Sequence, residues 1–466
     1  MRHELLLIAI TVILLVVEIF LPNTQKRKII LPAILLMGAV TLAGFLPGTP
    51  GILFGGMYQS TEFTIMLKNI LNIGVLIVFI QSVDWLRQEQ NKEKVSEFFL
   101  LMLSTLIGMN YMISAGDFLM FYIGLELATI PVAALAAYER LKEKSAEAGV
   151  KLIFMSALSS GIMLYGLSMI YGTTGTMYFA DVAPLITGAP LQALAFIFFF
   201  AGMAFKISLV PFHLWTADVY EGAPVNVTSY LSVISKGAAV FVLTIILYTV
   251  FYKIAVMWNE VLYIITILTI TVGNLFAMRQ QNLKRFLAFS SIAQAGFILL
   301  GIMGQSQLGM TTVVYFGLVY IFSNLGAFGV VGIISNRTGK ENINDYDGLY
   351  RTNPNLSLVM MLALFSLAGI PPLAGFFGKF FLFTAAAKQG YYWLVFIALL
   401  NTIISLYYYL LVIKAMLLNR SDRPIEKFNS DLYTRIGLLI CVAGMAIIGF
   451  ASPVYEMIFN LSFGLY

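Results

Sequence analysis

The chain has 466 residues, of which 60% are hydrophobic and only 11% are charged. This composition excludes a soluble globular protein, because most 19-residue windows pass a hydropathy test for membrane spans. The single cysteine, Cys441, excludes an intrachain disulfide and a cysteine-rich zinc site, and the two histidines, His3 and His213, argue against haem or copper. The net charge of +5 needs no nucleic acid to explain it, since the basic residues are sorted by loop.

Hydrophobic segments predict an all-α polytopic membrane protein with about fourteen transmembrane helices. The predicted spans are 4–21, 28–46, 64–86, 95–113, 116–138, 148–171, 189–212, 224–250, 258–278, 285–303, 310–335, 355–388, 391–418 and 433–459. Within one integral membrane domain, 1–466, we distinguish three N-terminal spans (1–94), a first five-helix unit (95–250), a second five-helix unit (258–418) and a C-terminal span (433–459).

Lysine and arginine support this count, because they gather in alternate loops. The loops after odd-numbered spans hold nineteen of the 28 basic residues, whereas the opposite loops and span ends hold Arg2, Lys68, Lys253 and Lys388. By the positive-inside rule the odd-numbered loops are cytoplasmic. We therefore expect both termini on the outer side of the membrane.

Two spans contain a proline break next to a lysine. Lys206 precedes Pro211 in span 7, and Lys379 follows Pro371 and Pro372 in span 12. As a continuous helix span 12 would be about 51 Å long, beyond a hydrocarbon core of about 30 Å. Charged, broken helices five spans apart predict a repeated transporter unit, formed by spans 4–8 and 9–13. Because five is an odd number, the two units would insert with inverted topology.

Glu126 lies in the middle of a predicted span, and Lys206 and Lys236 each lie a turn or more from the end of theirs. A lysine there costs roughly 2.5–3.5 kcal/mol on insertion scales, which indicates an ion pathway. The alternative is a lysine that reaches water from a helix end. Glu126 is a candidate partner that modulates Lys206, or half of a static ion pair that only fixes helix packing. Lysine suits proton transfer because burial lowers the pKa of a lysine toward neutrality, which arginine does not allow.

Hydroxyl and amide side chains on spans 8, 10 and 11 provide a candidate route between the lysines. Helix–helix hydrogen bonding is the commoner use of any one such residue. The relay candidates are Lys151, His213, Ser235, Tyr320 and Asn324, with Thr228, Ser229, Ser232, Ser290, Ser291, Gln294, Tyr315 and Ser323 as further polar groups. The cytoplasmic loop 213–223 has no lysine or arginine but carries Asp218 and Glu221, which indicates a water-filled mouth.

These residues carry a close resemblance to a known family. The chain resembles subunit N of bacterial proton-translocating NADH:quinone oxidoreductase (respiratory complex I), in the antiporter-like subunit family. The matching segments are 205–224, 235–237, 281–293, 324–328 and the break at 369–380. The resemblance implies that Glu126, Lys206, Lys236 and Lys379 are the proton-transferring charges and that Lys151 matches a further lysine. Gln294 stands where histidine is common in the family, and Phe289 where tyrosine is common, which puts a histidine relay there in doubt.

The resemblance also implies location and partners. It places the chain in a bacterial inner membrane, with periplasmic termini, beside other membrane and peripheral subunits of complex I that include antiporter-like subunits. The sequence has no flavin, nicotinamide or iron–sulfur motif. NADH, flavin, iron–sulfur clusters and quinone are therefore expected in partner subunits, and this chain is expected to be a translocase subunit without redox catalytic residues, cofactor or metal. Two alternatives remain: a cation/proton antiporter subunit of a multi-subunit sodium/proton exchanger, and a passive structural spacer.

Overall fold

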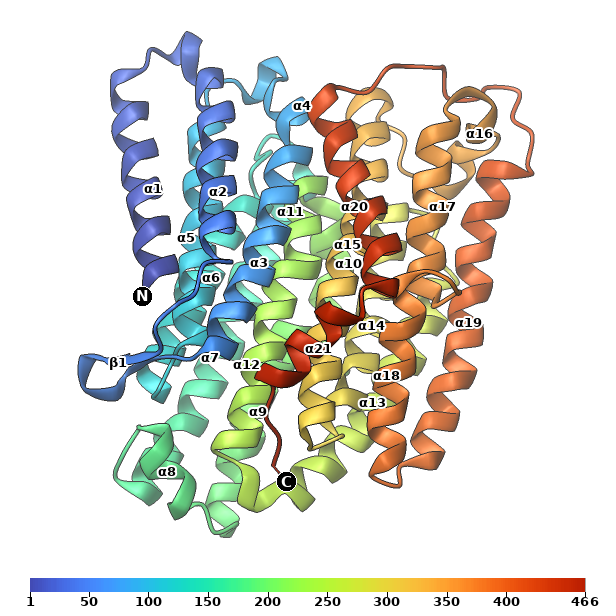
Figure 1. Cartoon of the computed structure of the whole chain (residues 1–466). Helices are drawn as coiled ribbons and strands as arrows, with labels where there is room; N and C mark the ends of the chain where they lie inside the picture. The colour runs from blue at the N-terminus through green and yellow to red at the C-terminus, as the bar shows by residue number, and fades with distance from the viewer. Residues whose placement is uncertain (466) are drawn as a thin grey trace.

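The computed structural model describes residues 1–465, apart from the side chains of Asn23 and Thr24. Its helices lie side by side in one bundle, from α1 (Arg2–Phe20) at one edge to α19 (Tyr392–Leu417) at the other (Figure 1). Among the described residues twelve helices are long and apolar enough to cross a membrane. Helices are expected there, because a helix satisfies its backbone hydrogen bonds internally where lipid offers no partner. The prediction of a helical membrane protein is confirmed.

The N-terminal part of the bundle contains a feature that an all-α prediction omits. Its helices are α1, η1 (Asn23–Ile29), α2 (Ile30–Ala43), α3 (Glu62–Gln81), α4 (Val83–Leu86) and η3 (Glu89–Asn91). Between α2 and α3, strand β1 (Gly51–Leu53) pairs antiparallel with β2 (Tyr58–Ser60), joined by η2 (Phe54–Gly56). Gly55 and Gly56 have φ angles of 63° and 101°, a region that glycine enters without steric cost, so they make the tight turn.

The helices from α5 to α12 correspond to the first predicted five-helix unit, 95–250. They are α5 (Val95–Ile113), α6 (Phe118–Ala136), α7 (Glu143–Thr174), α8 (Phe179–Leu185), α9 (Pro190–Ile207), α10 (Leu214–Gly222), α11 (Val225–Tyr230), the π turn η4 (Leu231–Ser235) and α12 (Lys236–Thr249). α5 and α6 pack closely because Gly108 faces Gly124. A Cβ added to either glycine would lie 2.5–2.8 Å from backbone atoms of the other helix.

The remaining helices surround α14 and α15. They are η5 (Tyr252–Ile254), α13 (Ala255–Ala277), α14 (Leu283–Ile302), α15 (Gln307–Thr338), η6 (Ile343–Tyr346), α16 (Leu349–Thr352), α17 (Pro354–Ala368), α18 (Ala374–Lys388), α19, α20 (Leu432–Phe450) and α21 (Ser452–Leu461). In α14 and in α15, 94% of the apolar window is buried, against 28% in α1 and α20. The polar side chains of α14 and α15 are therefore shielded from lipid.

Several predicted spans differ from the observed helices. Span 3 divides into α3 and α4, and span 8 into α11, η4 and α12. Span 7 was expected to reach residue 212, but α9 ends at Ile207. Span 12 divides into α17 and α18, as its two prolines predict. Span 14 also divides, at Ala451 between α20 and α21, because Pro453 lacks the N–H that a continuing helix would need.

Contacts between loops distinguish the two ends of the bundle. At the end that contains α4, uppermost in Figure 1, ion pairs with N–O distances of 2.8–3.3 Å join Arg27 to Glu89, Arg87 to Asp431 and Arg337 to Asp84. At the opposite end, which contains α8, backbone bridges join Tyr58 to Ala115 and Asp117 to Tyr178, and the Lys253 ammonium donates to the Pro184 carbonyl at 2.7 Å. We call these the α4 end and the α8 end.

Candidate functional site

The first helix break positions Lys206. Ser208, directly after α9, has a φ of 68°, and the N–H of Leu209 donates to the Ala204 carbonyl at 2.8 Å, which closes the last helical turn. Pro211 then prevents an early return to helix, because it lacks an N–H and disfavours helical backbone at the residue before it. Lys206 consequently lies in the last turn of α9, where the helix dipole favours a cation.

Lys206 contacts α6 through a hydroxyl. Its ammonium donates to Thr129 Oγ1 at 2.7 Å. Thr129 follows Glu126 by three residues, so both lie on one face of α6. Within residues 1–465 no hydrogen bond or ion pair joins Lys206 to Glu126, and Glu126 Oε1 is buried without a partner. Glu126 therefore lies one helical turn from the group that contacts Lys206, and it can act on the lysine only through space or through water.

The second helix break positions Lys379. Gly369, after α17, has a φ of 87°, and the N–H of Ile370 donates to the Phe365 carbonyl at 3.0 Å. Lys379, on α18, reaches back across this break and donates to the Ala368 carbonyl at 3.2 Å. Gly369 leaves the space, because a Cβ there would lie 3.1 Å from Lys379 Cδ. The break in span 12 thus leaves a backbone carbonyl that accepts a hydrogen bond from Lys379.

Lys236 follows directly on the π turn and lies beside a small cavity. Its ammonium donates to Ser291 Oγ at 2.9 Å, on α14, and lies 5.7 Å from the centre of the Tyr220 ring. The cavity has a volume of about 20 Å³ and is lined by Lys236, Ser232, Ser291 and Tyr320 among apolar groups. The Tyr320 hydroxyl is buried without a partner. A cavity of about 10–15 Å³ with two or more polar partners accommodates one water molecule.

Polar contacts along α14 connect the surroundings of Lys236 with those of Lys379. Ser291, which binds Lys236, lies three residues before Gln294, so both point to one side of α14. The Gln294 amide donates to the Leu367 carbonyl at 3.0 Å. Leu367 precedes Ala368, whose carbonyl accepts from Lys379. One turn of α14 thus separates the two lysine sites, and we call the set Lys236, Ser291, Gln294, Leu367–Ala368 and Lys379 the α14 bridge.

No comparable chain of contacts joins Lys206 to Lys236 within residues 1–465. The nearby hydroxyls of Ser208, Thr216 and Tyr220 are buried and lack hydrogen-bond partners. Buried hydroxyls are normally satisfied by protein or ordered water. This stretch therefore needs water to conduct a proton. The α14 bridge also needs water, but over a shorter distance, because its polar groups lie within one helical turn of one another.

The relay candidates are placed differently from one another. Tyr320 lines the Lys236 cavity, and Asn324 donates to Ser232 Oγ at 2.7 Å beside it. Ser235 is the last residue of the π turn and is 3% exposed. His213 is buried with Nδ1 unpartnered, in the segment that follows the α9 break. Lys151 does not reach these groups, because it is engaged at the mouth described next.

The acidic segment that was predicted as a loop, 213–223, forms helix α10, and its carboxylates are neutralised by basic residues of α7 and α14. Asp218 accepts from Lys151 at 2.7 Å and from Arg285 at 2.7 Å, and Glu221 accepts from Arg285 at 3.1 Å and from Lys144 at 2.8 Å. Burial by itself raises the pKa of both carboxyl groups, but these hydrogen bonds outweigh it, and each pKa lies below its ordinary value. The ion-pair network therefore fastens α10 to α7 and α14.

A buried ion pair near the N-terminus was not predicted from the sequence. Lys68 and Glu4, 1% and 0% exposed, are paired at 2.5 Å, and the Tyr58 hydroxyl donates to Glu4 at 3.0 Å and accepts from Lys68 at 3.1 Å. Lys68 was counted among the basic residues of the outer loops and span ends. Its position about two turns into α3 is the signal that would have identified it as buried, but its partner lies 64 residues earlier.

Comparison with known proteins identifies the family. A family model described as "NADH:quinone oxidoreductase/Mrp antiporter, TM" matches residues 115–405, an interval that contains Glu126, Lys206, Lys236 and Lys379. NADH-quinone oxidoreductase subunit N of Phocaeicola vulgatus is 54% identical over 98% of this chain and 97% of its own length. This chain belongs to the NADH-quinone oxidoreductase subunit N family. The resemblance inferred from the helix breaks and the lysine motifs is confirmed.

Solved structures share the fold. A chain of respiratory complex I from Thermus thermophilus, with bound aureothin, is similar with a TM-score of 0.82 and 28% identity, and the match covers 99% of this chain and 100% of that chain. A chain of the Mrp complex from a Dietzia species has a TM-score of 0.86 over 98% of this chain and 96% of that chain, at 20% identity. The second likeness concerns the fold alone, so membership of the subunit N family rests on the sequence relatives.

Proposed function

We propose that this chain is a proton-translocating membrane subunit of an NADH:quinone oxidoreductase, in which Glu126, Lys206, Lys236 and Lys379 carry or control the proton. The observation that carries the proposal is the α14 bridge, since it brings polar groups that contact the two buried lysines within one helical turn of each other. Membership of the subunit N family supports the coupling to a quinone oxidoreductase.

In the proposed mechanism, protons enter from the α4 end near Lys206 and Lys236. Lys206 exchanges its proton with water around the unpartnered hydroxyls of Ser208 and Tyr220, and Glu126 favours its charged form. Lys236 passes a proton to Lys379 through water molecules that are held by the polar groups of the α14 bridge, and Lys379 releases it at the α8 end. Lysine can perform these steps because its pKa responds to burial and to neighbouring charge, whereas arginine remains protonated.

The driving reaction belongs to other subunits in this proposal. Oxidation of NADH and reduction of quinone, with flavin and iron–sulfur clusters, are assigned to partner subunits. Charge changes at neighbouring antiporter-like subunits would reach this chain through its buried lysines and Glu126. His213, Ser235, Tyr320 and Asn324 are proposed as auxiliary relay groups, and Lys151 as a residue of the mouth.

We further propose fourteen spans, with two inverted five-helix units at 95–250 and 258–418 and both termini on the periplasmic side of an inner membrane. The loop contacts support this topology, because ion pairs join odd-numbered loops at the α4 end and backbone bridges join even-numbered loops at the α8 end. The two helix breaks, each with a left-handed residue and a lysine, support the repeat. Fluorescent protein fused after Arg420 should mature, whereas a fusion after Tyr466, which lies outside the described residues, should stay dark.

The second candidate function is that of a cation/proton antiporter subunit. The fold shared with the Mrp complex favours it. A sodium-free assay separates the two functions, because an antiporter needs a counter-ion and a redox-driven pump does not.

The test uses the assembled complex in sodium-free proteoliposomes, with NADH oxidation and proton uptake measured together. The wild type should acidify the lumen without sodium, and Lys236→Met should abolish proton transfer through this subunit. Lys414→Met is the matched control, because Lys414 is also a lysine of a predicted span but is exposed. A requirement for sodium in the wild type would favour the antiporter, and native pumping by Lys236→Met would refute the proposed route.

A further inference from the structure

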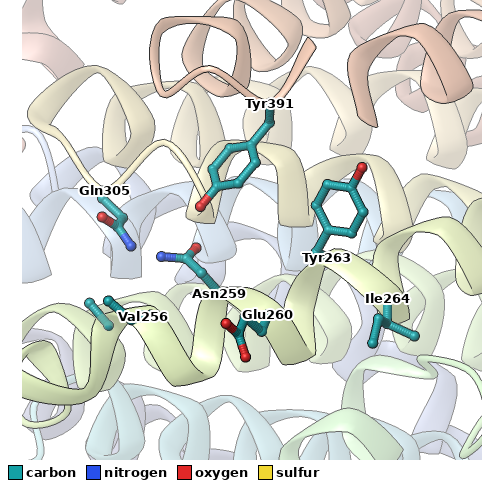
Figure 2. Close-up of a pocket in the computed structure, with 8 residues that line it drawn as sticks. Val256, Asn259, Glu260, Tyr263, Ile264, Gln305 and Tyr391 are labelled. Atoms are coloured by element: carbon teal, nitrogen blue, oxygen red, sulfur yellow. The ribbon is translucent and has the colours of Figure 1, made fainter. Parts of the chain in front are cut away.

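A recess of about 580 Å³ opens at the α8 end, away from the lysines and the α14 bridge. It is formed by the first turns of α13, by Gln305 in the loop between α14 and α15, and by Tyr391, which precedes α19 (Figure 2). The side chains of Asn259, Gln305 and Tyr391 point toward one another across it in Figure 2. Three separate segments therefore converge on one small space at the edge of the bundle.

Glu260 lies at the rim of this recess on an apolar helix face. Its neighbours one turn before and after on α13 are Val256, 77% exposed, and Ile264, 60% exposed. Glu260 is exposed, and within residues 1–465 no hydrogen bond or ion pair involves it. Glu260 lies two residues inside the predicted span 258–278, at the level of the lipid headgroups, so a cationic headgroup can reach its carboxylate.

The other lining groups suit a cation that donates hydrogen bonds. Asn259 is 6% exposed, and its Oδ1, an acceptor, is buried without a partner. The rings of Tyr263 and Tyr391 lie 6.1 Å apart at 50°, and aromatic faces attract ammonium groups. The residues that line the recess include no lysine, arginine or histidine. An anion such as a phosphate would therefore find no charged partner inside, whereas an ammonium would meet a carboxylate, an amide oxygen and two aromatic rings.

We propose that this recess binds the primary ammonium of an ethanolamine phospholipid headgroup. Glu260 pairs with the ammonium, Asn259 Oδ1 accepts one of its hydrogens, and the acyl chains lie along Val256 and Ile264. A choline headgroup carries no N–H, so it leaves Asn259 Oδ1 unsatisfied, and a glycerol headgroup carries no positive charge. The site is selective for ethanolamine over both, and it is independent of the proton route.

The test measures lipid retention by the assembled complex. The complex is purified in mild detergent, stripped of lipid, and incubated with phosphatidylethanolamine, phosphatidylcholine or phosphatidylglycerol before native mass spectrometry of the released subunit. Ethanolamine lipid should be retained in preference to the other two. Glu260→Gln should weaken that retention about tenfold, as expected for loss of one charge-assisted hydrogen bond.

Glu456→Gln is the matched control, because Glu456 is also exposed and has no ion pair among residues 1–465. It should retain ethanolamine lipid as the wild type does. Equal retention of the three lipids, unchanged selectivity in Glu260→Gln, or absence of bound lipid in the wild type would overturn the proposal. Displacement of the lipid by an equal concentration of free ethanolamine would show a site for soluble amines and would overturn its assignment to lipid.

Discussion

Lys68 and Lys379 are both buried lysines, but their partners differ in kind. Lys68 is paired with the Glu4 carboxylate at 2.5 Å, whereas Lys379 has a backbone carbonyl, Ala368 O, at 3.2 Å. A carboxylate stabilises the charged form of lysine strongly, and a carbonyl does so much less. The difference teaches that burial alone does not identify a proton carrier. A lysine suited to release its proton is one whose partners remain satisfied after the proton has left.

The largest effect is expected at Lys379. Lys379→Met keeps the length and apolar packing of the side chain but removes the titratable amine, so proton transfer should be abolished while the complex assembles. Lys379→Arg should also fail, because the pKa of arginine lies about 2–3 units above that of lysine and the neutral form becomes at least about a hundredfold rarer. Proton uptake by proteoliposomes and a native gel check the two outcomes.

Native pumping by Lys379→Arg beside a dead Lys379→Met would contradict this prediction. It would show that Lys379 is a fixed charge like Lys68, and the two lysines would then not differ in function.

The next effect concerns Lys68 and is one of stability. Lys68→Met leaves the Glu4 carboxylate buried and unpaired, which should cost about 3–5 kcal/mol. The double variant Glu4→Gln/Lys68→Met should recover most of this loss, because no charge remains buried. Thermal unfolding in detergent measures the change, and proton transfer per assembled complex should equal that of the wild type. Loss of pumping at normal stability would instead place Lys68 in the proton route.

Glu126→Gln should have a moderate effect. An opposite charge within about 4–6 Å changes a proton affinity by 1–3 pKa units, and Glu126 has no direct bond to Lys206, so we expect a reduction in pumping of about tenfold or less. The coupled rate of the reconstituted complex checks this. Glu97→Gln is a control at the neighbouring helix α5. A wild-type rate in Glu126→Gln would leave Glu126 with a structural role only.

The smallest effect is expected at the ion-pair network of the mouth. Because the folded pKa values of Asp218 and Glu221 are lowered, the network stabilises the fold above their ordinary values of 3.8 and 4.5. That stability is lost as the pH falls through the lower folded values. The carboxylates are partly exposed, so the change should be below about 1 kcal/mol. In the double variant Asp218→Asn/Glu221→Gln, the unfolding temperature should decrease less at acidic pH than it does in the wild type. The same decrease in both proteins would refute this role of the network.

Hydropathy and charge sufficed to predict a helical membrane protein, because lipid admits few alternatives to a helix with internally satisfied backbone groups. The helix breaks could also be predicted from the sequence, since proline removes a backbone hydrogen-bond donor wherever it occurs. The positions of Lys206, Lys236 and Lys379 in the fold follow from these two rules. The subdivision at Ala451 escaped prediction, because Pro453 lies in a segment whose hydropathy alone suggests one continuous span.

Contacts between segments that are distant in the sequence could not be predicted from hydropathy or from the positions of prolines. The donation from Gln294 to the Leu367 carbonyl joins residues 73 apart, and the Lys68–Glu4 pair joins residues 64 apart. Nothing local in either sequence segment specifies the partner, because the contact depends on how whole helices pack. For the same reason, Thr129 as the hydroxyl that meets Lys206 emerged only from the folded bundle.

The π turn at Leu231–Ser235 determines which way Lys236 points. A π turn accommodates one residue more than an α turn, and successive residues of an α-helix are about 100° apart around the axis. With regular α-helical hydrogen bonds through this segment, the lysine amine would be rotated by about that angle, away from Ser291 on α14. The backbone hydrogen bonds of this one turn therefore fix the direction of the Lys236 side chain around the helix axis. They determine which neighbouring helix the Lys236 amine faces.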